Sequence, residues 1–232
     1  MTILYIDAMA GIAGDMTAAA LLDLGVPLVY MTGQIETLQM PDRYTITTGC
    51  LVRHGMRGLY FRVVEEGAEH VEGHHNHHDH HNHDCHNHHD HGGSGHHEHH
   101  QHSHHHRSYA AIREMLMQAQ LEPGVQQRAL AMFRVLAEAE GRAHGIDVEQ
   151  VQFHEVGALD SIIDIVAVAA GLNWLGVDQI FVSAVPMGGG MVKTAHGLLS
   201  VPAPATIDLL RGFSLHTAYS HGERVTPTGA AI

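Results

Sequence analysis

The chain has 232 residues, 44% of them apolar, and a formal net charge of −13 with histidine neutral. This size and apolar content suit one globular domain or two small ones. The excess of acid argues against nucleic acid and anionic membranes as partners and favours divalent cations.

The N-terminal segment does not resemble a signal peptide. It lacks a basic region, and Asp7 and Asp15 interrupt its apolar residues. The apolar stretch at 162–175 is too short and too interrupted to span a bilayer. With only Cys50 and Cys85, a disulfide framework is not expected, so a cytoplasmic location is the default.

Residues 1–66 are expected to form the first part of an α/β domain. A strand at 2–6 and a helix at 15–24 give a strand–loop–helix unit at the start. A second helix is expected at residues 27–39. The two strands of a hairpin or meander are expected at residues 44–51 and 59–66.

Residues 67–107 are expected to be a disordered, metal-binding loop. Its residues 74–106, here called the histidine-rich tract, hold 19 histidines in 33 positions and no apolar residue to bury apart from Cys85. Imidazole suits Ni, Zn, Cu and Co, but flexible sites follow the Irving–Williams order and do not select one metal. The candidate ligands are His74, His75, His77, His78, His80, His81, His83, His86, His88, His89, His91, His96, His97, His99, His100, His102, His104, His105 and His106.

Residues 108–232 are expected to be helical and α/β. Ser108 is the expected N-cap of one helix, Pro123 opens a second that Gly141 and Gly145 end, and Asp160 caps a third at 161–175. Short strands are expected at residues 148–153, 179–185 and 213–219, and one short helix at residues 202–210. Because helices and strands alternate, the expected fold is α/β or α+β, a mixed sheet with flanking helices and the disordered insertion.

The loop from Asp7 to Asp15 is the first candidate site within the ordered part. Gly11 and Gly14 lie between a strand and a helix, where backbone N–H groups can bind phosphate. The loop is neither a Walker A nor a dinucleotide-binding motif. Asp7 and Asp15 are candidate metal ligands; equally, Asp15 caps the helix and Asp7 ends the strand.

A second candidate combines His154 and Glu155 with Asp160 and Asp164. The two aspartates are four residues apart and so share one helix face. An unpaired carboxylate in an apolar helix is unfavourable, which favours a metal or a proton-exchange partner for Asp164. The alternative is that Asp160 caps the helix and Asp164 makes an internal hydrogen bond.

A third candidate follows the strand expected at 179–185. Gly188, Gly189 and Gly190 allow close approach of a ligand, and Lys193, the only lysine in the chain, suits a phosphate or carboxylate. His196 follows. The alternative is a mobile hairpin with a solvated lysine.

These segments together resemble the LarC-type family of nickel-insertion proteins in lactate racemase cofactor biosynthesis. The resemblance runs along essentially the whole chain. The motifs that carry it are Tyr5–Met16, Ala20–Gly25, the internal histidine-rich loop, Phe153–Ile165, Pro186–Gly190, Ala195–Thr206 and Thr226–Ala231. Ala13 differs from the family, which often has serine there.

The resemblance implies a nickel chelatase, or cyclometallase, of the lyase class. It would insert Ni(II) into pyridinium-3,5-bisthiocarboxylic acid mononucleotide, giving a nickel-pincer nucleotide in which two sulfurs and one ring carbon hold the metal. The reaction would depend on CTP and on Mn(II) or Mg(II), through a C-terminal domain that follows the Thr226–Gly229 motif. The expected partners are therefore the nucleotide substrate and that C-terminal half, and homo-oligomerisation stays open.

The reaction needs three functions that the candidates could divide. The tract would be a nickel reservoir, and Gly11–Gly14 or Gly188–Gly190 with Lys193 would bind phosphate. His154, Glu155 or His196 would be the catalytic base for the ring proton. Two other interpretations stay open: a nickel or zinc storage or delivery protein without chemistry, and a nucleotide hydrolase to which the tract is incidental.

Overall fold

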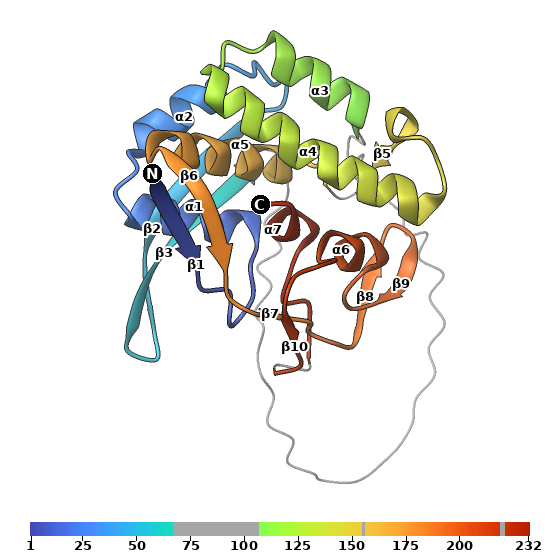
Figure 1. Ribbon diagram of the computed structural model, residues 1–232. Helices are drawn as coiled ribbons and strands as arrows, with labels where there is room; N and C mark the ends of the chain where they lie inside the picture. The colour runs from blue at the N-terminus through green and yellow to red at the C-terminus, as the bar shows by residue number, and fades with distance from the viewer. Residues whose placement is uncertain (67–106, 155, 219–220) are drawn as a thin grey trace, which may run out of the picture.

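The computed structural model describes residues 1–66, 107–154, 156–218 and 221–232. The expected loop at 67–107, apart from Arg107, lies outside the described residues, as does Glu155. The described part mixes helices with small sheets, which confirms the α/β class (Figure 1).

Helix α5 (Leu159–Trp174) lies at the centre of the main hydrophobic core. Its sequence is apolar on nearly all sides, and twelve of its sixteen residues are buried. Such a helix must be covered on every face. The helices that pack against it are α1 (Gly14–Asp23), α2 (Leu28–Glu36) and α4 (Pro123–His144). Helix α3 (Tyr109–Gln118) packs on α4, above it in Figure 1.

The strands pair two by two within the described residues and do not form one mixed sheet. Strands β1 (Thr2–Ile6) and β6 (Val177–Val182) are parallel. Strands β2 (Tyr44–Arg53) and β3 (Met56–Glu65) form an antiparallel hairpin that is longer than expected. Its two turn residues, His54 and Gly55, have φ of 50° and 79°, the left-handed conformation that a tight hairpin turn requires.

The smaller strand pairs fix loops against helices. Strand β4 (Arg107–Ser108) is antiparallel to β5 (Gln152–Phe153), with Arg107 opposite Phe153. The 3-10 turn η1 (Val148–Gln150) precedes β5, so the single strand expected at 148–153 was wrong in its first half.

The chain from β7 onward forms a second layer, which lies below α4 and α5 in Figure 1. Strand β7 (Val185–Pro186) is parallel to β10 (Leu215–His216), and β8 (Met191–Thr194) is antiparallel to β9 (Gly197–Ser200). The helices are α6 (Pro204–Leu209) and α7 (Pro227–Ala231). A small core joins this layer to the first loop of the chain through Ala8, Ile12, Val185, Leu210 and Val225.

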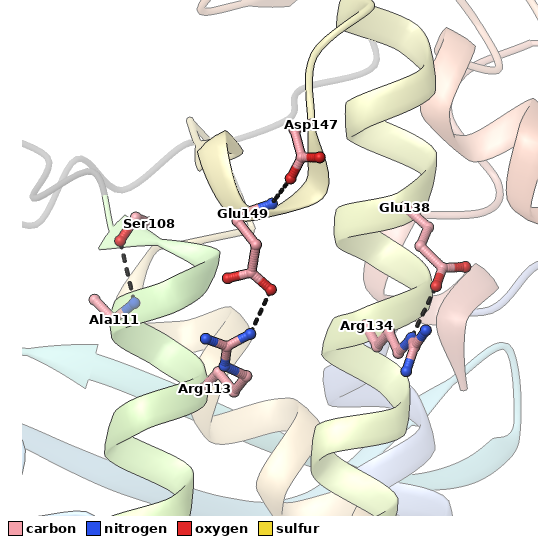
Figure 2. A network of polar contacts seen from close by, with 7 residues as sticks. All are labelled: Ser108, Ala111, Arg113, Arg134, Glu138, Asp147 and Glu149. Carbon is pink, nitrogen blue, oxygen red and sulfur yellow. Dashed lines mark hydrogen bonds and ion pairs between the residues drawn. The ribbon is translucent and has the colours of Figure 1, made fainter.

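Local side-chain contacts fix the region around η1, as Figure 2 shows. The Ser108 hydroxyl accepts a hydrogen bond from the Ala111 amide at 3.1 Å, which confirms the expected N-cap of α3. Asp147 accepts from the Glu149 amide at 2.9 Å, and Glu149 forms an ion pair with Arg113 of α3. A further ion pair along α4 joins Arg134 to Glu138 at 2.8 Å.

Two of the expected helix ends were wrong. Ala158, not Asp160, is the N-cap of α5, because the buried Leu159 already enters the first turn. Helix α4 runs through Gly141 and ends only at Gly145, where φ is 67°. The capping alternative for Asp15 was also wrong, since Ala13 is the N-cap of α1. Both aspartates therefore lie inside a first helical turn, where their charge is favourable.

Candidate functional site

A cavity of about 500 Å³ opens where the N-terminal turns of α1 and α5 meet strand β3 and the segment before α7. Four acidic side chains line this acidic cavity, together with one arginine and several hydroxyl groups. The polar and charged lining residues are Asp15, Asp160, Asp164, Glu223, Arg62, Tyr60, Ser161, Thr226 and Thr228.

Asp164 is the most deeply placed of these acids, with 9% of its surface exposed. Burial raises the pKa of its carboxyl group to about 8, and the nearby charges of Asp15 and Asp160 act in the same direction. A hydrogen bond from the Asp15 backbone amide opposes this rise by favouring the ionised form. The group is therefore mostly protonated at neutral pH, and a cation in the cavity would favour its ionisation.

Gly14 makes this contact possible because it has no side chain. A Cβ atom there would lie 2.8 Å from the Cβ atom of Asp164 and 2.9 Å from its Oδ2 atom. The first turn of α1 can therefore approach Asp164 closely enough for the amide hydrogen bond.

The other lining acids lie nearer to solvent. The carboxylates of Asp15 and Asp160 accept hydrogen bonds from the amides that follow them, Met16 at 2.8 Å and Ser161 at 2.7 Å. Each keeps further oxygen lone pairs for a ligand. Carboxylates and hydroxyls are the ligands that hard divalent cations prefer, and carboxylate is also acceptable to Ni(II).

No group of three or more His, Cys, Asp or Glu side chains in the described residues is arranged to hold a metal ion as it stands. The acids around the cavity would therefore have to approach one another, or bind the ion partly through water. Mutual repulsion favours the open arrangement when no cation is bound.

The first glycine loop, Gly11–Gly14, packs against the segment that precedes α7. Gly11 has φ of 128°, and a Cβ atom there would lie 2.1 Å from the Arg224 carbonyl oxygen. The Gly11 and Ile12 amides donate to the carbonyls of Ala8 and Arg224, each at 2.9 Å. These two amides are thus already used within the chain. Asp7 is exposed and does not line the cavity.

The second glycine loop, Gly188–Gly190, also contacts the segment that precedes α7. A Cβ atom on Gly188 would lie 2.3 Å from the Gly222 carbonyl oxygen, and Gly189 exchanges backbone hydrogen bonds with Gly222. Gly190 has open space around it. Lys193 is exposed on β8 and does not line the acidic cavity.

His154 and His196 lie next to each other, with ring centroids 4.8 Å apart. A third histidine, His144 at the end of α4, lies 4.8 Å from His196 and 6.4 Å from His154. Neither His154 nor His196 lines the acidic cavity. The sequence therefore identified two members of a histidine cluster and missed the third.

Arg62, Glu223 and Thr228 were also missed as lining residues. Thr228 belongs to the Thr226–Gly229 motif, in which the Thr226 hydroxyl accepts a hydrogen bond from the Gly229 amide at 3.0 Å and lies 2.9 Å from the Thr228 hydroxyl. Arg62 belongs to a strand, and nothing in its local sequence indicated a site.

Comparison with known proteins agrees with the family resemblance of the sequence motifs. The family model described as "Nickel insertion protein" matches residues 4–232. Relatives named for nickel insertion include proteins of Geobacter metallireducens, Geobacter sulfurreducens and Wolinella succinogenes, which are 45%, 43% and 40% identical over the whole of this chain.

The chain spans about half the length of these relatives, 51%, 51% and 50% respectively. No solved structure matches it. No helix of the described residues is long and apolar enough to cross a membrane. From the match along nearly its full length, the chain belongs to the nickel insertion protein family.

Proposed function

We propose that this chain is the nickel-binding N-terminal part of a cytoplasmic enzyme that inserts Ni(II) into pyridinium-3,5-bisthiocarboxylic acid mononucleotide. The product would be the nickel-pincer nucleotide cofactor of lactate racemase. The acidic cavity carries this proposal, because it combines space for a small organic substrate with four acidic side chains that attract a divalent cation.

In this proposal, Asp15, Asp160 and Asp164 hold the incoming Ni(II). Their mutual repulsion and the burial of Asp164 make the site unfavourable without a cation and favourable with one. Arg62, on the cavity wall, would contact the acidic groups of the nucleotide. Gly11, Gly14, Gly188–Gly190 and Lys193 stay predictions as phosphate ligands, and Asp7 as a metal ligand.

Metalation breaks one ring C–H bond, forms a carbon–nickel bond and releases one proton. The predicted bases were His154, Glu155 and His196, of which the two described do not line the cavity. We therefore assign the proton to a carboxylate of the cavity that does not hold the metal. CTP and Mn(II) or Mg(II) would act with the C-terminal half that the longer relatives contain.

The test is an insertion assay on this chain combined with such a C-terminal half, at limiting and at saturating Ni(II). Asp160→Asn should lower the rate at least tenfold at both nickel concentrations, while Asp23→Asn, an exposed acid in a weak ion pair, should leave it unchanged. A tract-neutral chain, full-length with the tract histidines replaced by asparagine, should be slow only at limiting nickel.

The rival is a nickel or zinc storage or delivery protein, which the composition of the tract favours. It predicts the reverse pattern: the tract-neutral chain fails at every nickel concentration, and Asp160→Asn behaves like the parent. That result would reject the proposed insertion site.

A further inference from the structure

We propose that His144, His154 and His196 form a second transition-metal site, suited to Ni(II) and separate from the acidic cavity. The three side chains come from the end of α4, from the residue after β5 and from the β8–β9 turn. Figure 1 shows the end of α4 above the β8–β9 hairpin. Residues 42 positions apart in sequence, His154 and His196, thus meet at one place on the surface.

The spacing of the rings fits one shared ion. A metal bound to an imidazole nitrogen at about 2.1 Å lies roughly 3.2 Å from the ring centroid. Two such rings would be about 4.5 Å apart at a right angle and about 6.4 Å apart on opposite sides of the metal. The observed separations are 4.8 Å, 4.8 Å and 6.4 Å, with His196 between the other two.

This pattern distinguishes between metals. Tetrahedral zinc would separate all three rings by about 5.2 Å, whereas a planar T arrangement matches three positions of a square-planar or octahedral ion. Ni(II) and Cu(II) adopt such geometries with nitrogen ligands. The cluster therefore favours Ni(II) or Cu(II) over Zn(II), a selectivity that the histidine-rich composition alone could not give.

The rings do not yet point their nitrogens at a common centre, since the described residues contain no complete metal-binding group. Rotation about the Cβ–Cγ bond turns a histidine ring while its centroid stays almost in place. This torsion is broad and roughly two-fold, so the rotation is inexpensive for exposed side chains. All three residues are exposed, which permits both the rotation and the entry of a hydrated ion.

A carboxylate already lies beside one of the proposed ligands. Glu140, one turn earlier on α4, places its Oε2 atom 3.4 Å from Nε2 of His144. Metal-bound histidines commonly donate their second ring nitrogen to a carboxylate, which fixes the tautomer and makes the other nitrogen a better ligand. This contact would leave Nδ1 of His144 for the metal.

The open, three-ligand character of the cluster suits transfer better than storage. An ion held by three exposed imidazoles keeps coordination positions for water or for an incoming ligand. The role we assign, supplying nickel to the insertion site, rests on the proposed function, whereas the metal site itself does not.

The decisive experiment is a Ni(II) titration of the tract-neutral chain at pH 7.5. His144→Ala, His154→Ala and His196→Ala should each weaken Ni(II) binding at this site by roughly 10–100-fold. The matched control His221→Ala, an exposed histidine outside the cluster, should change it less than twofold. With ¹³C-labelled histidine, substoichiometric Ni(II) should shift or broaden the ring signals of the three cluster histidines together and spare that of His221.

Unchanged affinity in all three alanine variants, or ring signals that neither shift nor broaden together, would overturn the proposed site. Loss of all Ni(II) binding in Asp160→Asn, with the histidine variants normal, would overturn it too, by placing the only nickel in the acidic cavity. If nickel insertion fails while the three histidines still bind Ni(II), the proposed function is wrong and the metal site stands.

Discussion

The backbone amide of Asp15 donates a hydrogen bond to the carboxyl group of Asp164, which fixes the first turn of α1 against the second turn of α5. The two helices that line the acidic cavity are thereby joined at the cavity itself. Stability and metal binding should consequently respond to the same few residues.

Asp164→Asn should stabilise the protein, and the gain should grow with pH. The pKa of Asp164 is raised by burial to about 8 in the folded state, so the folded chain keeps a proton that the unfolded chain loses above about pH 4. Stability therefore falls as pH rises between these values, by at most about 1.4 kcal/mol per pH unit. Asparagine still accepts from the Asp15 amide and does not ionise.

Thermal unfolding of both proteins at pH 5, 7 and 9 measures this difference. The melting temperatures should lie close together at pH 5 and diverge up to about pH 8. A gap that is the same at all three values would show that Asp164 ionises normally in the folded protein.

Gly14→Ala should destabilise the protein by about 1–3 kcal/mol, because the new methyl group would meet the Asp164 side chain at 2.8–2.9 Å. Gly33→Ala is the matched control: Gly33 also lies within a helix, but nothing approaches its Cβ position within 4 Å. It should stabilise the protein by roughly 0.5–1 kcal/mol. Urea unfolding gives both values, and effects of the same sign would contradict the close approach of the two helices.

Arg107→Gln should destabilise the protein by about 3 kcal/mol. Arg107 forms an ion pair with Asp42 in which both side chains are less than one-fifth exposed, and it also donates to the Gly157 carbonyl at 3.3 Å. Its loss leaves a largely buried carboxylate without its cation. Arg57→Gln removes an exposed ion pair with Asp23 and should change the free energy of unfolding by less than about 0.5 kcal/mol. Equal effects in chemical denaturation would argue that burial of the Arg107 pair is unimportant.

Mn(II) should raise the melting temperature of the tract-neutral chain, since an ion that binds only the folded state stabilises it by mass action. Asp160→Asn should reduce this rise and Asp23→Asn should preserve it, because Asp160 lines the acidic cavity and Asp23 does not. Addition of EDTA should reverse the effect. If Mn(II) stabilises both variants equally, the ion binds elsewhere.

Local periodicity predicted the helices well. The spacing of Val125, Ala129, Phe133 and Leu136 indicates the buried face of α4, and all four are buried. The same reasoning placed the buried helix that became α5. Its start was misjudged because an aspartate is a common N-cap, whereas burial of Leu159 begins the helix earlier.

The candidate sites were predictable only as separate pieces. Asp15, Asp160 and Asp164 line one cavity because α1 packs across α5, a tertiary contact that no local pattern encodes. His144 lay unnoticed at a helix end, and only the packing of the β8–β9 turn against α4 brings it beside His196. Glu223 and Arg62 likewise join the cavity from elements remote in sequence.

The pairing of Arg107 with Phe153 has a consequence for how metal reaches the protein. Arg107 directly follows the histidine-rich tract, and His154 directly follows Phe153. Whatever its conformation, any of the last ten residues before Arg107 must lie within about 35 Å of it, and seven of those ten are histidines. If the proposed cluster binds nickel, transfer from the tract to His154 would thus be an intramolecular step, at an effective concentration in the millimolar range.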